Sequence, residues 1–298
     1  MERNEQFALK APAKINLYLK ILGRREDGYH SLSSLMQMVG LYDLLKFQKE
    51  REGIKLRIEN SLLPADRSNL IFRAAELVQK EAERADGIQR GVAITLVKNI
   101  PIAAGLGGGS SDAAATLIGL NRLWSLRWPR KKLAQIGATL GSDLPFFFSG
   151  PAAWVSGIGE KVEQTEMKLP GWAVLVNSGN PVSTASVYEQ FSKKIGLTKR
   201  APEINMIELI AQRPALKEIL RHPHNDLEKV TLSTLPHLIQ IKRELHDLGG
   251  EGVLMSGSGP TLFALFRKLD IAKKAAFSIE KKSAVRVWVV RILRRSPL

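Results

Sequence analysis

Short stretches in which apolar and polar residues alternate predict β-strands along most of this chain. In KINLYLKI, residues 14–21, the aliphatic side chains fall on one face, and Lys14 and Asn16 fall together on the other. Both polar side chains can therefore face one ligand. Further strands are expected at residues 54–59, 92–97, 172–177 and 285–290, with a hairpin within 152–163 and a strand–turn–strand at 252–266.

Apolar residues spaced three and four apart predict helices between these strands. Helices are expected at residues 70–85, 112–124, 131–141, 184–191, 203–211 and 236–248, with a last one before the final strand. The segment GSDLPFFF, residues 141–148, is expected to turn into an apolar strand. The order of these elements predicts an α+β protein of two units, residues 1–165 and 166–298.

The composition is that of an ordinary globular protein, since 44% of the 298 residues are hydrophobic and 24% are charged. The absence of cysteine excludes a disulfide framework and a thiolate metal site. No apolar stretch reaches the roughly 18 residues that a membrane span needs, and the N-terminal residues lack the apolar segment of a signal peptide. We therefore expect a soluble protein of the cytoplasm that does not bind membranes.

The net charge of +15 is high, and residues 271–298 carry eight basic residues against one acid, Glu280. Such a tail could contact nucleic acid or an anionic membrane, or it could form an ordinary solvated surface. A basic surface also suits an anionic small substrate. Charge alone does not separate these alternatives.

The segment AGLGGGSSDA, residues 104–113, follows a predicted strand and leads into a predicted helix. Glycine lets the backbone approach phosphate oxygens, and the N–H groups at a helix N-terminus attract anions. Ser110 and Ser111 at the start of the helix can cap it, and they can also bind phosphate or a magnesium ion. The pattern indicates a polyphosphate site.

Three familiar phosphate-binding patterns do not fit this loop. A P-loop needs a lysine after its glycines, and none occurs between Lys98 and Lys131. The dinucleotide pattern Gly-x-Gly-x-x-Gly is met by Gly105 and Gly107 but has Ser110 in its last place. The HRD and DFG tripeptides of protein kinases are absent.

The stretch PIAAGLGGGSSDAA, residues 101–114, resembles the second motif of the galactokinase–homoserine kinase–mevalonate kinase–phosphomevalonate kinase (GHMP) superfamily. PAKINLYL at 12–19 and LMSGSGPTLFALF at 254–266 resemble the first and third motifs, in the right order. Residues 11–43, with their DGYH segment, are similar to the branch of 4-diphosphocytidyl-2-C-methyl-D-erythritol kinases, as are GSDLPFFF and HNDLE at 224–228. Ala103 departs from the glycine that many relatives carry.

The resemblance implies a two-domain GHMP kinase fold. Its N-terminal ATP-binding and catalytic domain is similar to the ribosomal protein S5 type, and its C-terminal substrate-binding domain is ferredoxin-like. It also implies a kinase that uses ATP and Mg²⁺ to phosphorylate the 2-hydroxyl of 4-diphosphocytidyl-2-C-methyl-D-erythritol, for isoprenoid precursors. The substrate would lie in the cleft between the domains.

The matched motifs assign roles to individual residues of this chain. Asp143 is the implied catalytic aspartate, and Lys14 is the implied catalytic lysine. From the sequence alone, Asp143 could equally be a turn residue that bonds its own backbone, and Lys14 a solvated lysine on a strand. The implied ATP-binding residues are Pro101, Ile102, Ala103, Ala104, Gly105, Leu106, Gly107, Gly108, Gly109, Ser110 and Ser111. The third motif supplies Ser256, Gly257, Ser258 and Gly259, which would face the nucleotide phosphates.

The acceptor and the metal complete the expected site. The implied substrate-binding residues are Asn16, Tyr29, His30 and Tyr188, with the three ring residues recognising cytosine. Tyr188 could equally pack in the core of its helix. Asp112 could hold magnesium together with Ser111, or it could point away into the first turn of the helix. Two alternatives stay open: a homoserine or mevalonate kinase type, and a basic nucleic-acid-binding protein with the same fold.

Overall fold

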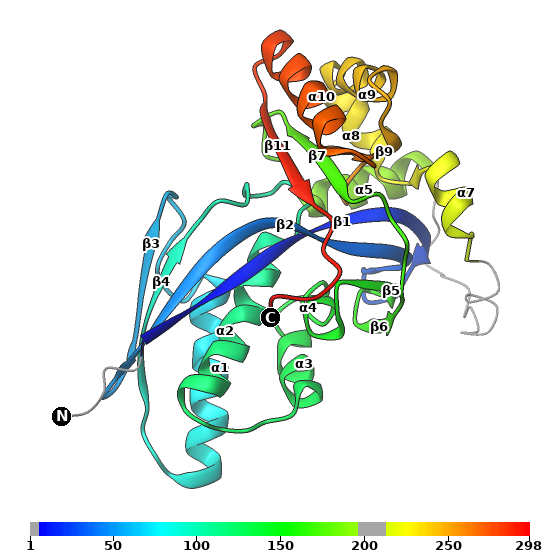
Figure 1. Cartoon of the computed structure of the whole chain (residues 1–298). Coiled ribbons are helices and arrows are strands. Elements are labelled where there is room, and N and C mark those ends of the chain that lie inside the picture. The colour runs from blue at the N-terminus through cyan, green and yellow to red at the C-terminus, as the bar shows by residue number, and fades with distance from the viewer. Residues whose placement is uncertain (1–5, 196–212) are drawn as a thin grey trace.

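The computed structural model describes residues 6–195 and 213–298, which form two β-sheets with helices packed on them (Figure 1). The first sheet is built around two long antiparallel strands, β1 (Gln6–Arg24) and β2 (His30–Glu50). Its main path runs β3–β4–β2–β1–β8, and β5 adds to β2 with β6 beside it. The other strands are β3 (Ile54–Glu59), β4 (Gly91–Val97), β5 (Ala152–Gly157), β6 (Lys161–Gln164) and β8 (His224–Asn225).

Four helices pack on this sheet around the first core: α1 (Leu70–Asp86), α2 (Gly108–Leu123), α3 (Arg130–Ala138) and α4 (Phe146–Ser149). Asn69 caps α1 by accepting a hydrogen bond from the Ile71 N–H at 2.9 Å, as its residue type favours. The expected strand at the end of GSDLPFFF is wrong, because Phe146–Ser149 is a short helix. Its three phenylalanines are all buried, so their apolar run reflects burial rather than a strand.

The second sheet has four antiparallel strands in the order β11–β7–β10–β9. They are β7 (Trp172–Asn177), β9 (Glu251–Met255), β10 (Leu262–Phe266) and β11 (Arg286–Arg291). The helices of this part are α5 (Thr184–Ile195), α7 (Leu216–Arg221), α8 (Glu228–Thr234), α9 (His237–Asp247) and α10 (Leu269–Lys282). The helix expected at 203–211 lies outside the described residues. In the described part of the chain, no helix is long and apolar enough to cross a membrane.

The two sheets are tied together by chain segments that return to the first one. Strand β8 pairs in parallel with β1, His224 opposite Tyr18. The chain after β11 runs back to β2, where the Leu293 N–H donates to the Met38 carbonyl at 3.2 Å. Leu298 then packs in the first core, only 8% exposed, and Figure 1 shows this end of the chain near α4. The α+β class is confirmed, and the division at residues 165 and 166 stays a prediction.

Candidate active site

The glycine-rich segment forms a loop followed directly by α2. The helix begins at Gly108, and its N-cap is Gly107 in the left-handed conformation, with φ of 68°. Ser110 and Ser111 therefore lie inside the first turn, and neither of them is the N-cap, one of the roles that their sequence position allowed. Glycine turns the chain at Gly107 without steric cost, so the helix starts four residues earlier than its apolar pattern indicates.

The loop backbone has positive φ at alternate residues, 50° at Ala103, 73° at Gly105 and 68° at Gly107. Ala103 therefore adopts the left-handed conformation at the position where many relatives carry glycine, against the usual preference of a residue with a Cβ atom. A Cβ atom at Gly105 would lie 2.0 Å from the Ser256 carbonyl oxygen. Only glycine lets the second and third motifs approach this closely.

The carbonyl of Gly105 joins all three motifs. It accepts hydrogen bonds from Lys14 Nζ at 3.0 Å and from Ser256 Oγ at 2.9 Å. The Asn16 N–H donates to Ser256 Oγ at 3.2 Å. Lys14 and Ser256, about 90 and 150 residues away in the sequence, thus fix the position of the Gly105 carbonyl. These contacts hold the glycine loop in place.

Lys14 lies at the centre of the site, and its side-chain Nζ is 3.6 Å from Asp143 Oδ2. Lys14 is only 3% exposed, and its Nζ also donates to Asn16 Oδ1 at 2.5 Å, as their shared face of the strand predicts. Burial lowers the pKa of Lys14 below its ordinary value, and Asp143 opposes this by stabilising the ammonium. Asp143 is the more open partner, since a third of its side chain is exposed.

A cavity of about 920 Å³ opens above this pair. Its lining contains these residues expected from the sequence: Lys14, Asn16, Tyr29, His30, Pro101, Ile102, Ala103, Ala104, Gly105, Leu106, Gly107, Gly108, Gly109, Ser110, Asp143, Tyr188, Gly257 and Ser258. Ser111, Asp112, Ser256 and Gly259 do not reach the cavity and are buried behind it. Segments from both sheets therefore enclose one space of ligand size.

Three aromatic residues surround one end of the cavity. Tyr29 is 60% exposed in the turn between β1 and β2. The His30 ring lies 5.1 Å from the Tyr188 ring, centroid to centroid, and His30 Nε2 lies 2.6 Å from Ser192 Oγ. Burial lowers the pKa of His30 and raises that of Tyr188, so both are uncharged at neutral pH. Tyr188 also packs against the second core, and its role toward a base stays a prediction.

A buried group of three charges supports the loop from below, and the sequence analysis missed it. Lys98 Nζ donates to Asp43 Oδ2 at 2.5 Å and to Asp112 Oδ2 at 2.7 Å. Asp43 Oδ1 also accepts the N–H groups of Asn99 at 2.6 Å and Ile100 at 2.8 Å. These contacts tie β2, the start of the loop and the first turn of α2 together. No signal in the sequence places Asp43 beside Lys98, 55 residues away.

Asp112 therefore points away from the cavity and into the first turn of α2. Burial raises the pKa of Asp112 well above its ordinary value, Lys98 opposes this shift, and Asp43 adds to it. Within the described residues, Asp112 Oδ1 and Ser111 Oγ have no hydrogen-bond partner. The same residues contain no cluster of three or more His, Cys, Asp or Glu side chains able to hold a metal. The groups that face the cavity, Asp143 and Ser110, fit an ion that also binds ligand phosphates and water, as Mg²⁺ usually does.

The third motif is held in place by polar side chains of its neighbours. Asn225 Nδ2 donates to the carbonyls of Met255 and Gly257, each at 2.8 Å. Thr231 Oγ1 donates to the Ser258 carbonyl, and the hydroxyls of Thr184 and Ser258 are 2.9 Å apart. Asn225 belongs to the HNDLE segment, so this segment positions the turn from behind.

Comparisons with known proteins agree with the motifs. The family model of the GHMP kinases N terminal domain matches residues 69–151, and the family model of the GHMP kinases C terminal domain matches residues 206–284. The chain is 45% identical to the 4-diphosphocytidyl-2-C-methyl-D-erythritol kinase of Syntrophus aciditrophicus over 94% of this chain and 97% of that protein. It is 43% identical to the enzyme of the same name from Syntrophotalea carbinolica, over 94% and 96% of the two chains.

The solved structures give the same result. A crystal structure of a 4-(cytidine 5'-diphospho)-2C-methyl-D-erythritol kinase matches with a TM-score of 0.75 and 33% identity, covering 96% of this chain and 99% of that one. The homoserine kinase of Cytophaga hutchinsonii matches with a TM-score of 0.71 at 18% identity, covering 99% and 97%. The latter likeness concerns the fold alone.

Proposed function

The chain belongs to the 4-diphosphocytidyl-2-C-methyl-D-erythritol kinases of the GHMP kinase superfamily, and we propose that Lys14 and Asp143 perform its phosphoryl transfer. It is an ATP-dependent kinase, a phosphotransferase with an alcohol acceptor, in isoprenoid precursor biosynthesis. Its substrate is 4-diphosphocytidyl-2-C-methyl-D-erythritol, and we propose the 2-hydroxyl as the acceptor. The observation that carries the proposal is the distance of 3.6 Å between Lys14 Nζ and Asp143 Oδ2 inside the cavity.

The proposed reaction needs one proton acceptor and one fixed positive charge. The acceptor oxygen forms a bond to the γ-phosphorus of ATP, the bond from that phosphorus to the β–γ bridging oxygen breaks, and ADP leaves. Asp143 takes the hydroxyl proton as the new bond forms. The ammonium of Lys14 lies beside the Asp143 carboxylate and stabilises the negative charge on the transferring group.

The glycine loop supplies the proposed cradle for the triphosphate. The N-terminus of α2 begins at Gly108, which lines the cavity, and the first N–H groups of a helix have no partner within it and attract anions. Ser110 and the turn at Gly257 and Ser258 border the same space. A magnesium ion bound there would neutralise phosphate charge, with Asp143 and Ser110 as the protein groups within reach of the cavity.

The aromatic end of the cavity is the proposed cytosine site. Tyr29 and Tyr188 offer flat faces for stacking, and the neutral His30 can bond the polar edge of a base. The free sugar phosphate, which lacks this base, would lose those contacts. Base recognition therefore distinguishes the proposed substrate from smaller alcohols. The cytoplasmic location and the absence of a nucleic-acid partner stay predictions.

The testing experiment measures ATP consumption with four acceptors in parallel. They are 4-diphosphocytidyl-2-C-methyl-D-erythritol, 2-C-methylerythritol 4-phosphate, homoserine and mevalonate. We expect the first compound to be used at least ~10²-fold more efficiently than the second, because a site built for polar groups rejects ligands that lack them. Faster turnover of homoserine or mevalonate would favour a sister kinase and contradict the proposed base site.

A further inference from the structure

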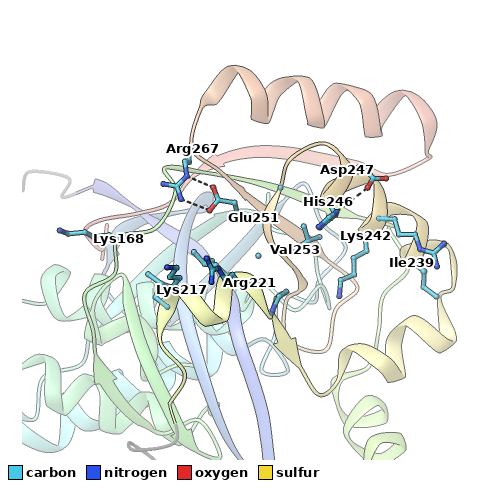
Figure 2. A pocket seen from close by; sticks show the side chains of 16 residues that line it. Lys168, Lys217, Arg221, Ile239, Lys242, His246, Asp247, Glu251, Val253 and Arg267 are labelled. Atoms are coloured by element: carbon cyan, nitrogen blue, oxygen red, sulfur yellow. Dashed lines mark hydrogen bonds and ion pairs between the residues drawn. The ribbon is translucent and has the colours of Figure 1, made fainter.

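A second cavity, of about 960 Å³, lies in the C-terminal part of the chain and shares no lining residue with the first (Figure 2). It is bordered by α7, by α9 and by β9, the edge strand of the second sheet. Its volume is typical of small-molecule sites, which are about 300–1,000 Å³. The proposed kinase reaction does not use this space.

The cavity combines an apolar floor with a basic rim. Leu216 and Leu220 of α7 and the buried Val253 of β9 supply aliphatic surface. Six cationic residues line the same space: Lys168, Lys217, Arg221, Lys242, Arg243 and Arg267. Figure 2 shows Lys217 and Arg221 side by side on α7, with Lys242 across the cavity from them. An apolar floor next to several cations suits a ligand with both an anionic group and a hydrocarbon part.

The positive charges of the rim are only partly balanced by the protein. Glu251 accepts from Arg267 at 2.8 and 3.1 Å, and Lys242 Nζ donates to Glu228 at 2.6 Å. The other four cations of the rim have no ion pair with any described residue. Asp247 lies within 3.7 Å of His246 and is largely exposed. A phosphate monoester carries a charge of about −1.5 to −2 at neutral pH. It therefore balances the excess positive charge of the rim better than a single carboxylate does.

Lys242 links this cavity to the third motif. The carboxylate of Glu228 that binds Lys242 also accepts the Met255 N–H, through Oε1 at 3.0 Å. Met255 immediately precedes Ser256, whose hydroxyl binds the Gly105 carbonyl of the glycine loop. A ligand that competes for Lys242 thus acts on a carboxylate bonded to the backbone beside the active-site turn.

We propose that this cavity is a regulatory site for a small, soluble phosphate monoester with a hydrocarbon tail. The phosphate binds Lys217, Arg221 and Lys242, and the tail covers the floor formed by Leu216, Leu220 and Val253. Occupancy shifts the balance of Lys242 between Glu228 and the ligand. The position of the third motif then depends on whether the cavity is filled.

Binding is tested by calorimetry on the full chain with octyl phosphate below its micelle concentration. A saturating non-hydrolysable ATP analogue fills the kinase site during the titration. We expect one bound molecule per chain, with affinity that rises by up to about fourfold per methylene from ethyl to octyl phosphate. Octanol and inorganic phosphate should each bind at least tenfold more weakly. Equal affinity for octyl and inorganic phosphate, or displacement by the ATP analogue, would overturn the proposal.

Two double variants separate the cavity from general electrostatics. Lys217→Gln with Arg221→Gln should weaken octyl phosphate binding by about tenfold. Lys273→Gln with Lys274→Gln removes the same charge from the exposed face of α10 and should change binding by less than twofold. Equal weakening in both pairs contradicts a defined site. Binding to phosphatidate vesicles but not to free octyl phosphate contradicts a soluble ligand.

The regulatory part is tested by kinase kinetics with the cavity saturated. Octyl phosphate should change the KM for ATP at least threefold in the unchanged protein. The variant lacking Lys217 and Arg221 should keep its basal kinetics and lose this response, because neither residue lines the kinase cavity. An unchanged KM at saturation, or the same response in that variant, would overturn the regulatory role.

Discussion

A Cβ atom at Gly107 would lie 2.9 Å from Cγ of Lys14, so the glycine loop and the candidate catalytic lysine pack without room for a side chain. Gly107 also has φ of 68°, which an alanine adopts only with strain. The N-cap of α2 and the position of the Lys14 ammonium are therefore one structural unit. A change in the loop alters the cradle and the catalytic pair together.

Gly107→Ala should lower both ATP affinity and kcat, each by at least about fivefold, because strain and the Lys14 contact cost more than about 1 kcal/mol for each. Calorimetry and steady-state kinetics measure the two effects, and circular dichroism checks the fold. Gly109→Ala is the matched control, since its added Cβ would meet only Leu70 Cδ1 at 3.5 Å. Similar losses in both variants would mean that the loop is merely sensitive to side chains.

Asp143→Asn should lower kcat by about 10²–10⁴-fold, the usual contribution of a positioned base, with little change in ATP affinity. The amide cannot take the acceptor proton, but it fills the same space beside Lys14. Rapid-quench kinetics and calorimetry separate the two quantities. Asp270→Asn, on the exposed first turn of α10, is the control. A variant that keeps more than half of the original kcat would remove Asp143 from the mechanism.

The pH profile of kcat should report the Lys14–Asp143 pair. Burial holds the pKa of Lys14 below 10.5, so its charge and the activity should be lost on the alkaline side below that pH. Asp143 raises this pKa, and the residual activity of Asp143→Asn should therefore fall at a lower pH than that of the unchanged protein. An alkaline limb that does not move, or moves upward, would contradict the electrostatic coupling.

Lys98→Met should destabilise the protein by about 3–5 kcal/mol, because it leaves Asp43 and Asp112 buried without their cation. The loss should be smaller at pH 5 than at pH 7. The pKa of Asp112 is already raised, and a carboxyl with a raised folded pKa favours the folded state as pH falls through that value. Urea unfolding at both pH values measures this. Lys80→Met, on the exposed face of α1, should change stability by less than about 0.5 kcal/mol.

Tyr29→Ala should reduce kcat/KM for the cytidylyl substrate by about 5- to 150-fold, since one stacked base contributes about 1–3 kcal/mol. Turnover of 2-C-methylerythritol 4-phosphate should change little, so the preference between the two acceptors narrows. Phe277→Ala removes an equally exposed aromatic outside the cavity and serves as the control. An unchanged preference would place the base elsewhere.

The sequence predicted the parts of this molecule that depend on local pattern. The alternation at residues 14–21 correctly placed Lys14 and Asn16 on one side, where they bond each other. Strand β2 was not predicted, because residues 32–39 are all buried and show no alternation of apolar and polar residues. Both faces of that stretch are covered, which removes the period of two on which the prediction depends.

In the candidate site, likewise, local sequence patterns did not predict the contacts between residues that are far apart in the chain. The composition of the glycine loop was enough to predict a phosphate site, and most of the residues that the motifs assign line the cavity. Lys98 looks like an ordinary lysine at a strand end, and only the fold brings Asp43 and Asp112 to it. Ser111 and Asp112 are adjacent to ligand-facing residues in sequence, yet helix geometry turns them inward.

The return of residues 292–298 to the first sheet affects the order in which the protein is assembled during translation. Domains usually fold as they leave the ribosome, the N-terminal one first. Arg130 Nη2 donates a hydrogen bond to the Leu298 carbonyl at 2.6 Å, and Gln37 Nε2 donates one to the Leu293 carbonyl at 2.8 Å. Both donors lie in the first part of the chain and lack these acceptors until residues 293 and 298 have been synthesised. The core around α2 and α3 can thus be completed only after the second sheet has been synthesised, so residues 292–298 complete a core whose other parts are made earlier.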